Sequence, residues 1–217
     1  MREKLLVAYQ QRHADFKSVR TTFPDVDMSG PFLISPNEHY NNQPFPLLII
    51  GQETKGWGDD VEDLNVQMNL YENFNLGEKY HSSPFWNITR KVEKALGNEP
   101  YTCTWTNISK YDVNCGRAYG LQAETIATLD DILLDEIKIL KPKVCLFFTG
   151  VDFDDRIKKI FPGVEYLPVK EHSHPDRFFR LKHTLLPTLT FRSDHPKYLR
   201  LSGQEQSIID YIKTLTK

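Results

Sequence analysis

The sequence is poor in cysteine and has no membrane-length apolar run. Its three cysteines, Cys103, Cys115 and Cys145, are an odd number without CxxC spacing, so neither a disulfide framework nor a zinc site is predicted. No segment approaches the roughly 18 to 20 apolar residues of a membrane span. The N-terminal MREKLLVAYQQRH also lacks the apolar core of a signal peptide. These absences predict a cytoplasmic protein with no membrane partner.

The chain also lacks an excess of either charge. Lys and Arg number 27 and Asp and Glu number 29, so the balance does not indicate a strong polyanion binder, and a nucleic-acid role would need a local basic patch. The C-terminal third offers basic and aromatic candidates for such a patch: Lys170, Arg177, Phe178, Phe179, Arg180, Lys182, His183, Arg192, Lys197 and Arg200. The same residues could equally form a solvated face.

Two kinds of ligand motif are missing as well. Gly51, Gly56 and Gly58 match neither the GxxxxGK[ST] phosphate loop nor the spaced glycines of a dinucleotide fold. The HSHPD segment at 172–176 has two histidines but no third metal ligand at suitable spacing, and we interpret it as a solvated loop. We therefore expect no cofactor and no metal.

Short apolar runs alternate with amphipathic stretches along the chain. The runs predict strands at 47–50, 102–106, 143–150, 164–169 and 185–191, and the amphipathic stretches predict helices at 3–20, 82–96, 128–142, 152–161 and 203–217, whereas 21–46 is typical of a loop and 59–81 is polar. This alternation predicts a three-layer α/β/α fold around a central, mostly parallel sheet of about four strands. We expect a single domain over 1–217, with the N-terminal helix and loop 1–45 packed on it.

Polar side chains follow the predicted strands at the point where each strand ends. In LLIIGQETKGWG (47–58), Gln52 and Glu53 come directly after a buried run. Asn107 ends the next alternating strand, and His195, followed by Pro196, lies just past another. Ligands of open α/β sheets bind beyond the carboxyl ends of the strands. We therefore expect two amides, a carboxylate and an imidazole to meet at one edge of the sheet.

These segments, taken in order, resemble the uracil-DNA glycosylase superfamily. The IGQET of 50–54 resembles the family's GQDPY motif, and WTNISKYD (105–112) resembles the strand whose Asn reads the uracil edge. SPFWNITRKVEKAL (83–96) is similar to the Pro- and Ser-containing segment that touches the DNA backbone. LDEIKILKPKVCLFFTG (134–150) and SDHPKYL (193–199) resemble the later helix–strand pair and the HPSPL motif. The resemblance covers roughly residues 46 to 200, and its weight comes from the order of the motifs, since none is specific alone.

The resemblance implies a uracil-DNA glycosylase-like domain that acts in base-excision repair of DNA as a monomer. Its catalytic residues would be Glu53 and His195. Its other site residues fall into a substrate-binding set and a DNA-binding set: Gly51, Gln52, Trp57, Phe85 and Asn107 for the substrate, and Ser83, Pro84, Lys197, Leu199 and Arg200 for DNA. Leu199 falls where the family has the residue that enters the duplex. Trp57, Phe85 and Trp86 are all candidates for the aromatic face that receives the base.

The chemistry explains this assembly of residues. Cleavage of an N-glycosidic bond leaves an oxocarbenium-like sugar and a departing uracil anion. Glu53 would supply negative charge near the sugar, and His195 a hydrogen-bond donor at the base oxygen. The planar amide of Asn107 can match the N3 and O4 edge of uracil and disfavours cytosine, whose donor pattern is reversed.

The sequence departs from the family at several positions. Glu53 stands where the best-known branch has Asp, and Thr54 and Lys55 replace the Pro and the Tyr that blocks the thymine methyl group. Either Trp57 takes over this exclusion or the substrate differs. The four-cysteine iron–sulfur cluster of the thermophilic branches is also missing, because three cysteines cannot supply it.

Other functions are compatible with the same residues. Singly, Glu53 could be a solvated loop acid, His195 an ordinary loop histidine and Asn107 a strand-end amide. The alternatives are a hydrolase of another nucleobase or nucleoside, and a non-catalytic member of the fold that binds nucleic acid or protein.

Overall fold

The computed structural model of the chain describes residues 1–80 and 82–216. Its elements cluster into two compact units, each built from three segments of the chain. The first unit comprises Met1–Pro36, Gln52–Phe74 and Thr106–Leu140, and the second comprises Asn37–Gly51, Asn75–Trp105 and Lys141–Lys217. The expectation of a single domain over 1–217 stays a prediction. No helix of the described residues combines the length and the hydropathy needed to cross a membrane.

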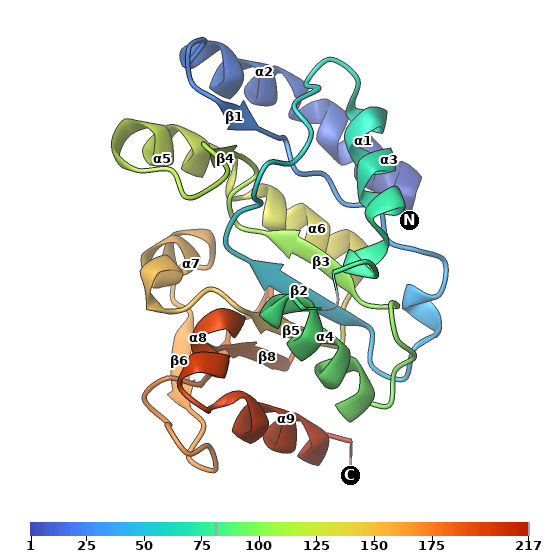
Figure 1. The fold of residues 1–217 in the computed structure, drawn as a ribbon, viewed down its shortest axis with the longest axis vertical. Coiled ribbons are helices and arrows are strands. Elements are labelled where there is room, and N and C mark those ends of the chain that lie inside the picture. Colours follow the sequence, from blue (N-terminus) through green and yellow to red (C-terminus); the bar gives the residue numbers. More distant parts are fainter. Residues whose placement is uncertain (81, 217) are drawn as a thin grey trace. The chain divides into compact units, whose positions relative to one another are not determined.

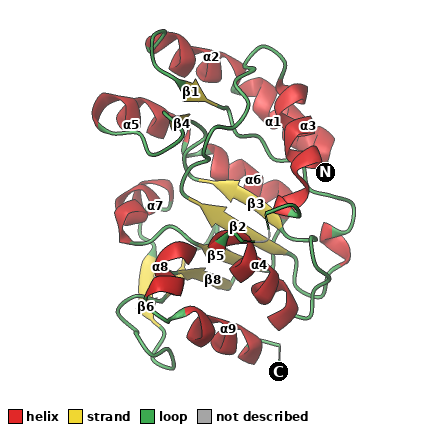
Figure 2. Cartoon of the chain, viewed as in Figure 1, coloured by secondary structure: helices red, strands yellow, loops and turns green. Residues whose placement is uncertain are grey.

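Among the described residues, the central sheet has six strands in the order β3-β2-β5-β8-β7-β6. The strands β2, β3, β5, β6 and β8 are labelled in Figures 1 and 2. Their bounds are β2 (Leu47–Gly51), β3 (Thr104–Asn107), β5 (Val144–Phe147), β6 (Glu165–Pro168), β7 (Phe179–Lys182) and β8 (Leu189–Arg192). β2, β5 and β8 are parallel, with Leu47 paired to Val144 and Val144 to Leu189. The predicted α/β class with a mostly parallel sheet is therefore confirmed.

Two antiparallel strands extend the sheet beyond the predicted count of about four. β6 pairs with β7 and β7 pairs with β8, both antiparallel. The sequence of β7, FRLK, contains two cations and is followed by a histidine. Such a short charged strand near the edge of a sheet has no continuous apolar run to predict it. The strand β5 (VCLF), in contrast, is apolar and fully buried, and it lies within the apolar run that predicted it.

In the part of the second unit that the structure describes, the α-helices are α4 (Pro84–Ala95), α7 (Asp154–Ile160), α8 (Pro196–Leu201) and α9 (Glu205–Thr214). α4 packs against both α8 and α9. The predicted start of α4 is confirmed, because Pro84 lies in its first turn, although the Ser83 side chain makes no capping hydrogen bond. Glu93 of α4 is buried and accepts the backbone N–H groups of Thr102 and Cys103 at 3.0 and 2.8 Å, which anchors the chain entering β3.

The first unit contains the helices α1 (Arg2–Gln11), α2 (His13–Thr22), α3 (Leu64–Phe74), α5 (Gly120–Ile126) and α6 (Ile132–Leu140). The prediction of one helix over 3–20 is wrong, because the helix is interrupted at Arg12 and forms two helices, α1 and α2. The Arg12 guanidinium binds Asp15 and Asp131 at 2.6 and 2.8 Å. A helix, α3, also forms within the polar segment 59–81. It buries Leu64, Met68 and Tyr71.

Short elements complete the fold. β1 (Met28–Ser29) pairs antiparallel with β4 (Asp112–Val113) in the first unit. The 3-10 helices are η1 (Tyr40–Asn42), η2 (Asn75–Gly77), η3 (Ala127–Leu129) and η4 (Val151–Phe153).

Candidate functional site

Hydrogen bonds join the loop that carries Glu53 to the chain segment that directly follows Asn107. Gln52 and Glu53 directly follow β2, and Asn107 is the last residue of β3. The Ser109 N–H donates to the Gln52 carbonyl at 2.9 Å. Because this bond ties the first residue after β2 to the residues after β3, the predicted carboxylate and amide are carried by loops of fixed relative position in the first unit.

Asp112 makes the second connection between these loops. Its Oδ2 accepts the hydroxyl of Thr54 at 2.6 Å and the N–H groups of Gly56 and Trp57 at 3.0 and 3.5 Å. Asp112 is only 1% exposed. Gly56 has φ of +73°, and a Cβ there would lie 3.1 Å from Cys115 Sγ, so the turn requires glycine. Asp112 ends the WTNISKYD segment, but no sequence pattern indicates its hydrogen-bond partners.

Glu53 lies beside a cation that sequence reasoning missed. The Arg117 Nε atom is 3.8 Å from Glu53 Oε2, and the Glu53 side chain is 11% exposed. Arg117 follows Asn114 and Cys115, which both have positive φ. A residue reached through such an irregular turn has no periodic pattern that would assign it to a site. Asn107 itself is buried, with 1% of its surface exposed.

Trp57 is held in an aromatic cluster of the first unit. Its ring meets Phe32 edge-to-face at 4.8 Å between centroids and Phe74 at 5.4 Å. Edge-to-face contacts of this kind add to the burial energy and restrict the ring. The half-buried Trp57 is therefore a rigid wall next to the Glu53 loop.

His195 occupies the N-cap position of α8 in the second unit, three residues beyond β8. Its Nδ1 accepts the N–H of Lys197 at 3.2 Å. Because Nδ1 is the acceptor, the neutral imidazole carries its proton on Nε2. The ring lies 6.3 Å from that of Phe85, which also contacts Phe148 at 5.8 Å. The structure thus brings His195 and Phe85 together.

The strand ends of β5 and β8 are hydrogen-bonded to each other beyond the regular ladder. Ser193 N–H donates to the Phe147 carbonyl, and Gly150 N–H donates to the Ser193 carbonyl, both at 2.9 Å. These bonds hold the chain that leads into His195. Gly51, at the end of β2, is buried. Trp86 is 8% exposed and packs edge-to-face on Trp105, so its position is that of a core residue.

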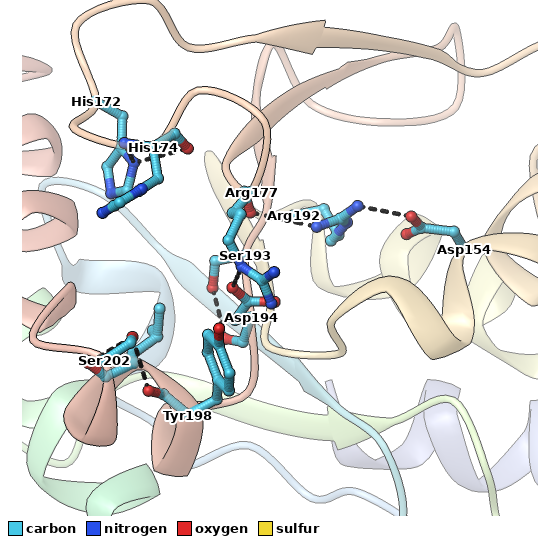
Figure 3. Close-up of polar contacts among 10 residues, drawn as sticks. Asp154, His172, His174, Arg177, Arg192, Ser193, Asp194, Tyr198 and Ser202 are labelled. Carbon is cyan, nitrogen blue, oxygen red and sulfur yellow. Dashed lines mark hydrogen bonds and ion pairs between the residues drawn. The ribbon is translucent and has the colours of Figure 1, made fainter.

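An arginine–aspartate pair lies directly beside this segment (Figure 3). Arg177 binds Asp194 through two nitrogens, with Nη2 at 2.9 Å from Oδ1 and Nε on Oδ2. The Arg177 guanidinium also lies over the Tyr198 ring, 4.4 Å from its centroid. Arg192 donates to the Arg177 carbonyl at 3.2 Å and to Asp154 Oδ2 at 2.6 Å. From the sequence, Arg177 and Arg192 were expected only as members of a basic patch.

The residues assigned to DNA contact differ in exposure. Lys197 and Arg200 are exposed on α8, and Ser83 and Pro84 are half-buried at the start of α4. Leu199 is 1% exposed, which does not fit a residue that enters the duplex. Leu199 therefore faces the interior of the unit, and the helix that carries it, α8, packs against α4 and α9. Leu201, in the same helix, is 78% exposed.

The HSHPD segment is not entirely solvated as predicted, because His172 is 4% exposed. Its Nδ1 lies 3.1 Å from both the N–H and the carbonyl of His174, and its ring packs 5.0 Å from Phe178. Burial lowers the pKa of His172. Within 1–80 and 82–216, no group of three or more His, Cys, Asp or Glu residues is arranged to hold a metal ion.

Comparison with known proteins does not assign the chain. No family model matches the sequence, and no curated protein is significantly similar to it. The candidate site residues therefore fall into two separate groups, one in each unit. The first unit carries Gln52, Glu53 and Asn107 on joined loops, and the second carries His195 and Phe85 in contact.

Proposed function

We propose that this protein hydrolyses the N-glycosidic bond of uracil or a related damaged base in DNA. The observation that carries the proposal is the hydrogen bonding between the loop of Glu53 and the loop of Asn107, through Ser109 and Asp112. The proposal includes a uracil-DNA glycosylase-like fold, a monomeric cytoplasmic enzyme, and a reaction that needs no metal or cofactor.

Glu53 is the proposed acidic group at the sugar. As the glycosidic bond breaks, positive charge develops on the deoxyribose ring, and a fixed carboxylate stabilises it or orients the attacking water. The mostly buried side chain of Glu53 suits this role, because electrostatic interactions strengthen where water is excluded. Arg117, at 3.8 Å, limits where the carboxylate can point.

His195 is the proposed donor to the departing base. With Nδ1 occupied by the Lys197 N–H, the neutral ring has its proton on Nε2. A neutral Nε2–H can hydrogen-bond the carbonyl oxygen on which uracil develops negative charge. This requires no change of tautomer during the reaction, which lowers the cost of reorganisation.

Asn107, Trp57 and Phe85 are the proposed base-recognition residues. A planar amide that donates and accepts can pair with the polar edge of uracil, whereas cytosine would present a mismatched pattern. The rigid Trp57 ring is the proposed wall that excludes larger bases. Phe85 is the proposed stacking face, because it is half-buried, whereas Trp86 belongs to the core.

DNA would be held by Ser83, Pro84, Lys197 and Arg200. Lys197 and Arg200 are exposed cations near His195 in the chain, and cations at phosphates contribute most of the sequence-independent affinity for DNA. The target base must leave the stack before cleavage, which costs a few kcal/mol.

The test is cleavage of labelled oligonucleotides that contain one uracil, as single strands and opposite A or G, with alkali to reveal abasic sites. We expect Glu53→Gln and His195→Ala each to lower the rate by about 100-fold or more. Glu38→Gln and His39→Ala are matched controls, because both side chains are exposed. Because the proposal requires Glu53 and His195 to act on the same nucleotide, the double variant should lose much less than the product of the two single effects.

The outcomes separate this function from its rivals. Release of a base from free nucleosides, without cleavage of DNA, would identify a nucleoside hydrolase. Salt-dependent binding of oligonucleotides without cleavage would identify a non-catalytic binding protein. Cleavage that survives both Glu53→Gln and His195→Ala would contradict the site assignment.

A further inference from the structure

We propose that Arg177 is a positioning residue that fixes the orientation of the His195 imidazole by binding the chain on both sides of it. The inference deepens the proposed function. It rests on that function only for its activity measurement.

Arg177 contacts the residue immediately before His195. Its Nε and Nη2 bind the two carboxylate oxygens of Asp194, whose side chain is 5% exposed (Figure 3). A two-pronged pair of this kind fixes the plane of the carboxylate as well as its position. Because Asp194 and His195 are consecutive, the orientation of Asp194 constrains the backbone from which the imidazole projects.

Arg177 also contacts the helix that follows His195. Its guanidinium lies over the Tyr198 ring at 4.4 Å. The N–H of Tyr198 donates to the His195 carbonyl at 2.8 Å, and the Lys197 N–H donates to His195 Nδ1 at 3.2 Å. The start of α8 therefore sets the tautomer of the ring, and Arg177 holds that start through Tyr198.

The position of Arg177 is itself fixed. Its carbonyl accepts a hydrogen bond from Arg192 at 3.2 Å, and Arg192 is 2% exposed and paired with Asp154. Arg192 ends β8, so the loop that carries Arg177 is tied to the rigid sheet. Arg177 thus connects three parts of the site: its carbonyl binds Arg192 at the strand end, and its guanidinium contacts Asp194 before the imidazole and Tyr198 in the helix after it.

The alternative is that the pair only stabilises the loop 170–178. A merely structural pair would leave the imidazole of a folded variant unchanged. If the pair positions the imidazole, its loss would change the share of the Nε2–H tautomer of His195. The reason is that the Lys197 N–H could leave Nδ1 once Asp194 and Tyr198 are released.

The test is nitrogen NMR of the full-length protein labelled with ¹⁵N in histidine, which distinguishes the two ring tautomers. The chain has seven histidines, so the His195 signals are assigned by their loss in His195→Gln. The variants are Arg177→Gln, Asp194→Asn and Arg177→Lys, which keeps the charge but not the two-pronged geometry. Arg180→Gln is the matched control, because Arg180 lies on β7 and its side chain donates to the Thr188 carbonyl at 3.1 Å.

We expect Arg177→Gln and Asp194→Asn to lower the Nε2–H share of His195 or broaden its signals, Arg177→Lys to have a smaller effect, and Arg180→Gln to have none. On a uracil substrate, kcat should fall on the order of 10- to 100-fold in Arg177→Gln with a smaller change in KM. An unchanged His195 spectrum in folded Arg177→Gln would overturn the inference. If Arg177→Gln does not fold, unchanged His195 spectra in both Arg177→Lys and Asp194→Asn would overturn it. If the wild-type protein cleaves no DNA, the proposed function fails, whereas the NMR comparison still decides the role of Arg177.

Discussion

The carboxylate of Asp112 accepts the Thr54 hydroxyl at 2.6 Å, across 58 positions of sequence. The same oxygen accepts two backbone N–H groups of the turn at Gly56 and Trp57. A buried carboxylate that satisfies three donors in one turn determines the path of the loop next to Glu53. Its loss should therefore affect both stability and activity.

Asp112→Ala should lower the free energy of unfolding by about 2–3 kcal/mol, because hydrogen bonds to a charged group are lost and buried donors remain. Thr54→Val removes only one of the three donors and should cost about 1 kcal/mol. Urea denaturation of both variants measures the difference. Equal stability of Asp112→Ala and the wild type would show that water replaces the carboxylate without cost.

Leu199 and Leu201 should respond in opposite ways to truncation. Leu199→Ala should lower the free energy of unfolding by about 2–4 kcal/mol, because it leaves a cavity at a buried position. Leu201→Ala should change stability by less than about 0.5 kcal/mol, because Leu201 is exposed. If Leu201 enters the duplex, its truncation should slow cleavage of double-stranded but not single-stranded DNA. A slower reaction on both strands alike would argue against this role.

Lys110 and Glu136 form an ion pair in the interior of the first unit, with both side chains 0% exposed and 2.6 Å between Nζ and Oε1. Lys110→Met should cost about 3–5 kcal/mol, because the Glu136 carboxylate stays buried without its cation. Adding Glu136→Gln removes that charge and keeps one amide oxygen as the acceptor for the Tyr9 hydroxyl. The amide N–H can donate to the Thr106 oxygen, which accepts from Lys110 in the wild type. The double variant should therefore be more stable than Lys110→Met in urea denaturation, and a further loss would contradict this account.

Acid should destabilise the protein through His172. Burial lowers its pKa in the folded state, so the unfolded chain binds the proton more tightly. The resulting loss in the free energy of unfolding is absent well above the ordinary pKa of about 6.5 and grows as the pH falls below it. Its full size, reached below the lowered pKa, is about 1.4 kcal/mol for each unit by which the pKa is lowered. His172→Gln should flatten the fall in melting temperature between about pH 7 and 5, whereas the exposed His39→Gln should not. If the melting temperatures of His172→Gln and the wild type fall in parallel between about pH 7 and 5, His172 is not the cause of the acid destabilisation.

Local pattern predicted much of the fold. The apolar run at 47–50 became β2, and the Pro at the first turn of 84–95 marks the start of α4, because burial and backbone preference act over neighbouring residues. The helix α3 also had a signal, since Leu64, Met68 and Tyr71 recur at helical spacing. The charged strand β7 had none, because its place in the sheet depends on its pairing with β6 and β8.

The rule that ligands bind beyond the carboxyl ends of parallel strands likewise singled out Glu53, Asn107 and His195, which lie at or just past the ends of strands. It could not find Arg117, Asp112 or Arg177 as partners, because each acts on a residue that is distant in the chain or separated by an irregular turn. The burial of Leu199 was hidden for the same reason. The position of Leu199 in a motif does not show whether its side chain is exposed, because the rotation of α8 about its axis determines which of its residues face solvent.

The order of apolar and polar residues was sufficient for the α/β class, the parallel strands and the polar residues at their ends, because these follow from the periodicity of strands and helices. Which carboxylate is paired, which histidine nitrogen carries the proton and which leucine is exposed were settled only in the folded chain. Those properties come from contacts between segments far apart in sequence, and no local pattern encodes them.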